Sequence, residues 1–200
     1  MSPRPDVSEE RRNQIIESAI KVLAREGFAN TRMDDVAVES GLSKGLLYWY
    51  FKSKEEIIIA IADVLFGAAL HKLQNFPLEG QTARALLENY IEIYIADLRG
   101  LLKFTPIIYE FYALAFRNRA VRQVMQEYLH RFVAILEPLV QRGIDTGEFA
   151  SGNAQQITIA IGAAFEGTLL LWAYDPEMVQ VEAQLRVVMA VLLNGLEASK

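Results

Sequence analysis

Residues 31–56, TRMDDVAVESGLSKGLLYWYFKSKEE, contain the local signals that decide the fold of this chain. Thr31 is placed to cap a short helix, and Gly41 is placed to end it, because glycine adopts the left-handed conformation at little cost. Ser43 and Ser53 are placed to cap two further helices. Two short helices joined by a glycine turn form a helix-turn-helix, in which the second helix enters the major groove of DNA. The stretch therefore predicts a DNA-binding unit.

The second of these helices has side chains that suit a contact with DNA. Its N-terminus carries Lys44 and Gly45, where backbone N–H groups and a lysine charge favour phosphate oxygens. Lys54 lies in the first turn of the next helix, where its charge opposes the helix dipole, and a phosphate partner would explain that position. Each lysine or tyrosine alone is read more simply as a solvated surface residue, but the caps and the glycine turn together favour DNA. The candidate DNA-binding residues are Thr31, Arg32, Met33, Ser43, Lys44, Gly45, Leu46, Tyr48, Trp49, Tyr50 and Lys54.

The same stretch resembles a known family. The segment GLSKGLLYWYFKSKEE at residues 41–56 is similar to the signature of the tetracycline-repressor (TetR) family of bacterial transcription regulators, and residues 27–28 and 31–37 match its upstream half. Trp49 stands where the family often has histidine, and Leu46 stands where a smaller residue or threonine is common. Both differences lie on the helix expected to read DNA. The resemblance covers about the first quarter of the chain, and it implies a homodimer with a small-molecule inducer site in the helices that follow.

The composition describes a globular chain without thiol chemistry. Of its 200 residues, 52% are hydrophobic and 22% are charged, and there is no cysteine, so disulfides and thiolate metal sites are excluded. The two histidines, His71 and His130, do not stand at a metal-ligand spacing. We therefore expect no metal and no cofactor. The first twelve residues lack the apolar core of a secretory signal, which predicts a cytoplasmic protein.

The charge is distributed unevenly along the chain. The net charge is −5, yet residues 1–54 carry nine of the 20 basic residues and only eight of the 25 acidic ones. The rest of the chain is therefore acidic. Because an acidic body repels DNA, we expect the N-terminal segment to be the docking end.

The apolar pattern predicts helices throughout. Between residues 82 and 196, apolar side chains recur every third or fourth position, and no stretch shows the alternation of a β-strand. Asp175 followed by Pro176 is typical of a cap and a first helical residue, so we expect the last helix to begin there. The prediction is an all-α fold of about nine helices. A three-helix helix-turn-helix domain would occupy residues 1–55, and a helical ligand-binding and dimerisation domain residues 56–200.

Residues 157–174 are long and apolar enough to span a membrane, but they carry Glu166 near the middle, where a charge is costly in lipid. A helix that is apolar all round in a soluble protein is buried on every side. Gly162 and Gly167 permit close contact with another helix. We therefore expect no membrane partner, and a homodimer in which the last two helices of each chain form a four-helix bundle. A two-fold dimer also suits a palindromic DNA site.

The helices between residues 82 and 175 hold many of the aromatic side chains. The simpler interpretation of most of them is core packing, and the alternative is a largely apolar ligand cavity. Glu110 and Glu166 each interrupt an apolar helix; each carboxylate either pairs with an arginine or a tyrosine hydroxyl, or anchors a ligand, for which a cation held against aromatic faces is one option. The candidate ligand-binding residues are Tyr90, Tyr94, Phe104, Ile108, Glu110, Phe111, Tyr112, Tyr128, Phe132, Phe165, Glu166 and Leu169.

Three functional hypotheses follow from the sequence. The leading one is a ligand-responsive transcriptional regulator and not an enzyme: a dimeric repressor that a small, largely apolar molecule releases from a palindromic operator in double-stranded DNA. The second is a DNA-binding regulator with a fully packed core and no ligand. The third is an all-helical enzyme that uses the cavity. An enzyme needs a nucleophile, a metal or paired acid and base residues, and the sequence shows none of these in a recognisable pattern.

Overall fold

The computed structural model describes residues 7–74 and 80–198. Within these residues the chain is helical, and its only β-type pairing is an isolated bridge between Phe149 and Glu197. This confirms the predicted all-α fold. The elements in chain order are α1 (Val7–Asn30), α2 (Met33–Ser40), α3 (Lys44–Tyr50), α4 (Lys54–Gln74), α5 (Ala83–Leu101), the 3-10 helix η1 (Leu102–Phe104), α6 (Thr105–Ala115), α7 (Arg119–Asp145), α8 (Ala154–Tyr174) and α9 (Val181–Leu196).

The chain divides into two compact units. The head unit comprises residues 1–67 and 103–127, and the body unit comprises residues 68–102 and 128–200. Helices α4 and α7 each contribute to both units, so they are continuous connections between them. The domain boundary expected between residues 55 and 56 stays a prediction.

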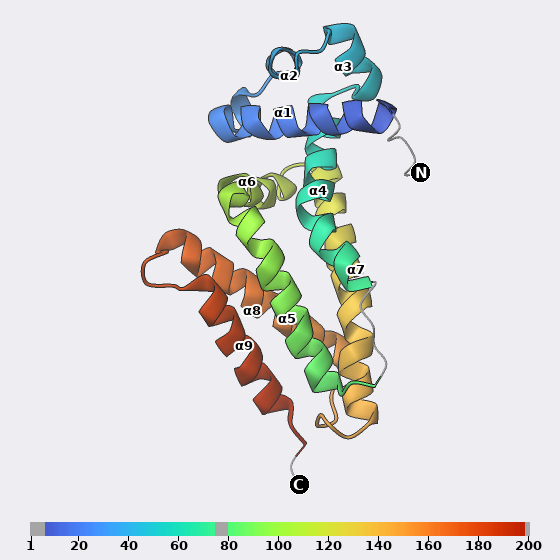
Figure 1. Ribbon diagram of the computed structural model, residues 1–200, viewed down its shortest axis with the longest axis vertical. Coiled ribbons are helices and arrows are strands. Elements are labelled where there is room, and N and C mark those ends of the chain that lie inside the picture. Colours follow the sequence, from blue (N-terminus) through green and yellow to red (C-terminus); the bar gives the residue numbers. More distant parts are fainter. Residues whose placement is uncertain (1–6, 75–79, 199–200) are drawn as a thin grey trace, which may run out of the picture. The chain divides into compact units, whose positions relative to one another are not determined.

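The head unit is built around α1. Figure 1 shows α2 and α3 together along one side of this helix. The shared core contains Ile15 and Ile16 of α1, Val36 of α2 and Leu47 of α3, all of them buried. Burying one such aliphatic side chain is worth about 1.5–3 kcal/mol, so this small cluster fixes the two short helices against the long one. Gly27 interrupts α1 with a φ of 73°, a backbone conformation that glycine adopts at little cost.

The first cap prediction was wrong by one residue. Helix α2 is capped at Arg32, not at Thr31, and the backbone N–H of Arg32 donates to the Asp35 carboxylate at 3.1 Å. The Thr31 hydroxyl instead donates to the Gly27 carbonyl at 2.8 Å. Thr31 is buried because its side chain closes the end of the preceding helix.

The other local signals around the turn are confirmed. Gly41 ends α2 with a left-handed φ of 67°. The Ser43 hydroxyl accepts a hydrogen bond from the Leu46 N–H at 3.2 Å and caps α3. The Ser53 hydroxyl accepts one from the Glu56 N–H at 3.3 Å at the start of α4. A two-helix unit with a glycine turn is therefore present where the sequence placed it.

The body unit packs α5, α8 and α9 together with the part of α7 from residue 128 onward. Its core is one cluster of apolar side chains. Thr82 caps α5 by accepting a hydrogen bond from the Ala85 N–H, and Asn153 caps α8 by accepting one from the Gln156 N–H. The predicted start of the last helix was wrong. Asp175 accepts from the Met178 N–H within a turn, and α9 begins only at Val181.

Candidate DNA-binding helix and ligand cavity

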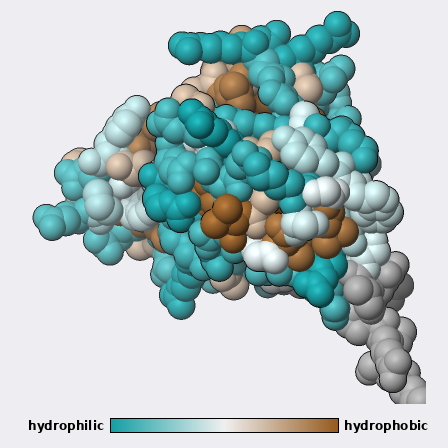
Figure 2. Space-filling view, turned by 90° about the horizontal axis from the view of Figure 1, so that it is seen from above, coloured by the Kyte–Doolittle hydropathy of each residue, from teal (hydrophilic) through white to brown (hydrophobic). Residues whose placement is uncertain are grey.

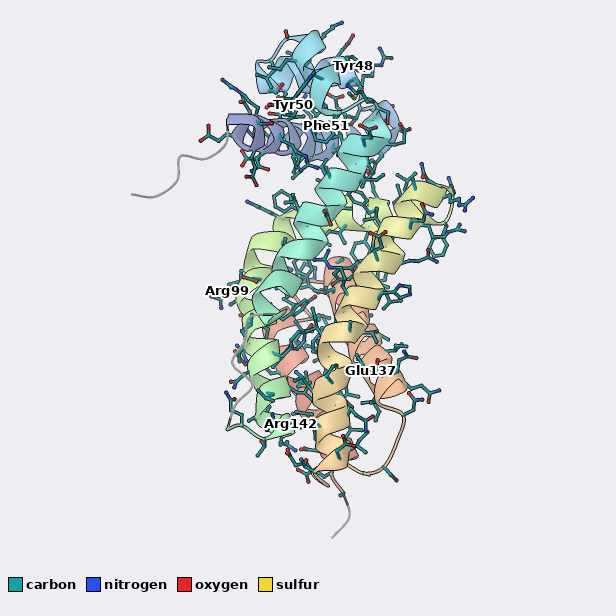
Figure 3. The ribbon with its side chains drawn as sticks, turned by 90° about the vertical axis from the view of Figure 1, so that its right-hand side faces the viewer. Tyr48, Tyr50, Phe51, Arg99, Glu137 and Arg142 are labelled. Carbon is teal, nitrogen blue, oxygen red and sulfur yellow. The ribbon has the colours of Figure 1, made fainter. Side chains whose placement is uncertain are left out.

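Helix α3 presents most of its side chains to solvent. Leu47 is fully buried and anchors the helix, whereas Tyr48 is 43% exposed and Trp49 is 64% exposed. Figure 3 shows Tyr48 at the outer edge of the head unit and Phe51 nearer to α1, in agreement with the guanidinium of Arg12 lying 5.3 Å from the centre of the Phe51 ring. The exposed side of α3 is therefore held in a fixed orientation by its buried side.

The N-terminus of α3 carries the cation that the sequence placed there. Lys44 Nζ lies 2.7 Å from Asp34 Oδ2, and both side chains are more than half exposed. The hydrogen bond to Asp34 raises the pKa of the Lys44 ammonium, so it stays charged at neutral pH. Water screens an ion pair as exposed as this one, so it contributes little to stability, and a phosphate oxygen can compete with Asp34 at little cost.

The remaining candidate DNA-binding residues fall into two groups. Ser43, Lys44, Gly45 and Arg32 are exposed, as is Leu46 in part, and Met33 and Tyr50 are half-buried. Thr31 is buried, and Lys54 Nζ donates a hydrogen bond to the Phe28 carbonyl. The position of Lys54 thus has an explanation within the protein, and its contact with DNA stays a prediction. One basic residue beside the candidates was not among them: Lys52 Nζ donates to the Tyr48 and Trp49 carbonyls at the end of α3.

Figure 2 looks onto the molecule from the end that carries α1 to α3 in Figure 1. Hydrophilic residues make up most of this surface, and apolar residues are interspersed among them. A polar face of this kind suits contact with phosphates and base edges, to which protein side chains donate hydrogen bonds.

A cavity of about 220 Å³ lies within the body unit, between α5, α7 and α8. It unites six of the predicted ligand-binding residues, which are Tyr90, Tyr94, Tyr128, Phe132, Phe165 and Glu166. The prediction missed four lining residues, which are Leu129, Ile159, Gly162 and Ala163. A signal for most of them was present, because positions 159, 162 and 163 share one helical face with position 166.

The structure separates the other six candidates from this cavity. Phe104, Ile108, Glu110, Phe111 and Tyr112 belong to the head unit, and Leu169 packs against the body core. Glu110 Oε2 accepts a hydrogen bond from the Phe28 N–H at 3.0 Å, and the Phe28 and Phe111 rings meet edge to face at 4.8 Å. Glu110 and Phe111 thus pack α6 against the end of α1 in the head unit.

The cavity combines aromatic rings with one carboxylate. The Tyr90 and Phe165 rings lie 6.3 Å apart and within 13° of parallel, and the Tyr94 and Phe165 rings lie 5.6 Å apart at 33°. Burial raises the pKa of the Tyr90 and Tyr128 hydroxyls well above the ordinary value, and the charge of Glu166 adds to the effect. Both phenols are therefore neutral at physiological pH and can act as hydrogen-bond donors.

Helices α8 and α9 keep exposed apolar side chains. Leu171 and Tyr174 of α8 are 57% and 75% exposed, and Val187 and Val191 of α9 are 53% and 64% exposed. In the described part of the chain, α8 is the helix with the length and composition to cross a membrane, and 22% of its apolar window is buried. A helix of a soluble bundle with an uncovered apolar side passes the same test, so this is weak evidence for a membrane.

The described residues hold no group of three histidine, aspartate or glutamate side chains that could bind a metal. His130 is exposed on α7, and the side chain of His71 lies outside the described residues. Among the described residues, the candidate functional sites are therefore the exposed helix α3 of the head unit and the aromatic cavity of the body unit.

An anchored, solvent-facing second helix after a glycine turn defines a helix-turn-helix DNA-binding protein. Residues 15–61 match the family model of bacterial regulatory proteins of the tetR family, and residues 83–196 match the C-terminal domain of BetI-type transcriptional repressors. The chain belongs to the TetR family and is a DNA-binding transcriptional regulator.

Known proteins resemble this chain over most of its length. The HTH-type transcriptional regulator YfiR of Bacillus subtilis (strain 168) is 35% identical over 152 residues, which cover 74% of each chain. The structure of the Bacillus subtilis regulator FadR in complex with stearoyl-CoA is 25% identical with a TM-score of 0.79, covering 92% of this chain and 99% of that chain. A transcriptional regulator from Pseudomonas aeruginosa PAO1 shares the fold, with a TM-score of 0.84 at 19% identity over 96% of this chain and 92% of that one. The two Bacillus subtilis relatives are transcriptional regulators, and the Pseudomonas aeruginosa structure adds the likeness in fold.

Proposed function

We propose that this chain is a cytoplasmic, ligand-responsive repressor that binds a palindromic operator as a homodimer. The observation that carries the proposal is the geometry of α3, whose capped N-terminus and aromatic side chains face solvent while Leu47 anchors the helix in the core. A recognition helix contacts base edges with its N-terminal residues while nearby groups bind phosphates. Lys44, Tyr48 and Trp49 are the side chains we assign to these contacts.

Dimerisation is assigned to α8 and α9. Their exposed side chains Leu171, Tyr174, Val187 and Val191 recur at helical spacing, and exposed apolar surface of this kind marks an interaction site. A second copy of the same two helices covers it by two-fold symmetry and completes a four-helix bundle. The two copies of α3 then read two half-sites one DNA turn apart, about 34–36 Å for regulators of this class.

The cavity in the body unit is assigned to the effector. Its presence favours a ligand-responsive regulator over one with a fully packed core, because unfilled apolar space is costly to retain. Helices α4 and α7 run from one unit into the other. A ligand that binds better to a conformation with the wrong half-site spacing shifts the population toward that conformation and lowers the affinity for DNA. The FadR relative carries stearoyl-CoA, which supports ligand binding in this family of folds.

The test is selection of bound sequences from random DNA, followed by gel-shift titration of the winning sequence. We expect an inverted repeat whose half-sites are about one helical turn apart. Repeating the titration with a metabolite panel identifies compounds that release the protein. A selection that enriches no sequence, from a protein shown to be folded and dimeric, would contradict the proposal. Enrichment of an operator without release by any compound would favour the ligand-free regulator.

A further inference from the structure

We propose that the cavity of the body unit binds a small organic cation, which it holds between the Glu166 carboxylate and the surrounding aromatic rings. The regulatory meaning of this binding rests on the function proposed above, but the binding itself does not. Four features of the cavity carry the inference: its charge, the arrangement of its rings, its size and its access to solvent.

The charge of the lining is negative. Among the ten described residues that line the cavity there is one carboxylate, Glu166, and there is no lysine, arginine or histidine. The tyrosine hydroxyls in the lining can donate or accept hydrogen bonds but add no positive charge. The negative charge of this carboxylate makes the electrostatic potential inside the cavity favourable for a cation and unfavourable for an anion. Glu166 also interacts with other groups of the protein, so a ligand cation adds to those contacts or replaces one of them.

The rings offer the second attraction. Tyr90, Tyr94 and Phe165 lie close together with their planes within 33° of one another, so their electron-rich faces point along similar directions. A cation near such faces is attracted by the ring quadrupoles, and the attraction is larger when water is excluded. Tyr90 and Phe165 are buried, which provides that exclusion. An uncharged ligand of the same shape gains the apolar contacts but not these electrostatic ones.

The size of the cavity selects small molecules. Its volume of about 220 Å³ lies below the range of about 300–1,000 Å³ that holds drug-sized ligands. One wall is shaped by Gly162, where an added Cβ would lie 2.8 Å from Cε1 of Phe132. The glycine thus lets the Phe132 ring lie directly against α8. A long acyl chain with a coenzyme A head exceeds this space and adds negative charge beside Glu166.

The cavity is open to solvent on the side of α7 and α8. Of its lining residues, Leu129 is 47% exposed and Ile159 is 45% exposed, and they come from these two helices. A ligand therefore has an entry between two apolar side chains. Quaternary ammonium groups suit such an entry, because their charge is shielded by methyl groups and they lose little hydrogen bonding when they leave water.

The experiment compares two molecules of the same shape that differ in charge. Meta-hydroxyphenyltrimethylammonium is the cation, and meta-tert-butylphenol is its uncharged counterpart. Isothermal titration with the full chain gives a Kd for each, and stearoyl-CoA serves as the anionic alternative. We expect the cation to bind at least about tenfold more tightly than the phenol, which corresponds to about 1.4 kcal/mol. Equal binding, or tighter binding of the phenol, would overturn the proposal. So would tight binding of stearoyl-CoA that the cation does not displace.

Variants separate the charge from the shape of the site. In Glu166→Gln, which keeps the size of the side chain, we expect the preference for the cation to fall to within about threefold, with the affinity for the phenol unchanged. The matched control is Glu137→Gln, a change at a half-buried carboxylate on α7 that does not line the cavity (Figure 3) and that should keep the full preference. If Glu166→Gln unfolds, Phe165→Leu replaces it, since losing one ring lowers the affinity for the cation more than that for the phenol. A preference that survives both changes would refute the assignment of Glu166 and Phe165.

Failure of the inference is distinguishable from failure of the proposed function. Gel-shift titration with the selected operator is carried out separately, with and without the cation. A protein that binds the operator but shows no charge preference is a regulator with another ligand. A protein that shows the charge preference but binds no operator retains the cation site, and only the regulatory proposal fails.

Discussion

The role assigned to Lys44 can be measured through the salt dependence of DNA binding. Lys44 stands at the first position of α3 with its ammonium more than half exposed and hydrogen-bonded to Asp34. If that ammonium binds a phosphate, the Lys44→Ala variant loses one phosphate contact in each chain and two in the dimer. Each lost contact lowers the magnitude of the slope of log Kobs against log salt concentration by about 0.9, so the dimer slope changes by about 1.8.

This change in the slope of the salt dependence is large enough to measure by gel shift or fluorescence anisotropy. Between about 50 and 200 mM salt, a slope difference of about 1.8 narrows the affinity gap between the native protein and the variant about twelvefold. Asp34→Asn should act in the opposite direction, because it frees the Lys44 ammonium and removes a negative charge from the docking face. Lys103→Ala is the control, since it removes an exposed lysine of the same unit that lies on η1. A slope for Lys44→Ala equal to that of the native protein would remove Lys44 from the DNA interface.

Four further changes test the packing and the assembly that support these sites. Leu47→Ala removes a fully buried anchor of α3 and should lower the free energy of unfolding by about 2–5 kcal/mol, with loss of operator binding; a denaturant melt that does not shift would show that α3 is anchored otherwise. Gly143→Ala places a Cβ 2.1 Å from Cδ2 of Phe149 and should cost about 1–3 kcal/mol. In Gly100→Ala the added Cβ meets nothing within 4 Å, so this change should raise the free energy of unfolding by up to about 1 kcal/mol. Thermal unfolding of the Gly143→Ala and Gly100→Ala variants shows whether the first is destabilised and the second stabilised. Val187→Glu places a charge on the exposed side of α9 and should yield monomers in sedimentation analysis with weakened operator binding, whereas an intact dimer would place the interface elsewhere.

Short-range chemistry was readable from the sequence because its causes lie within a few residues. Gly41 and Ser43 were assigned correctly, since a left-handed glycine and a serine cap depend on neighbouring backbone groups alone. The cap of α2 was misplaced by one residue because Thr31 has an alternative acceptor in the Gly27 carbonyl. Asp175 was misjudged for a related reason. An aspartate before proline closes a turn as readily as it caps a helix, and here it accepts from the Met178 N–H.

Only half of the predicted ligand-binding residues line the cavity. Helical periodicity shows which side of a helix is buried, but it does not show which other helix packs against that side. The aromatics of α5, α7 and α8 meet around one space, whereas those of α6 pack with α1 in the other unit. Both sets have the same composition and spacing. Gly162 was interpreted from the sequence as permitting contact with another helix, yet this small residue also lines the cavity, together with Ala163.

Glu110 shows that a carboxylate within an apolar helix can have its partner in the protein backbone and away from the cavity. A carboxylate in an apolar helix suggested a ligand anchor, but its partner is the Phe28 N–H, just after the point where Gly27 breaks α1 with a φ of 73°. That backbone donor exists only because the glycine interrupts the helical hydrogen bonding. Glu110 therefore fastens α6 to the DNA-binding unit. Helix α6 thus belongs to the same compact unit as the helix-turn-helix, and the effector site proposed for the body unit does not include Glu110.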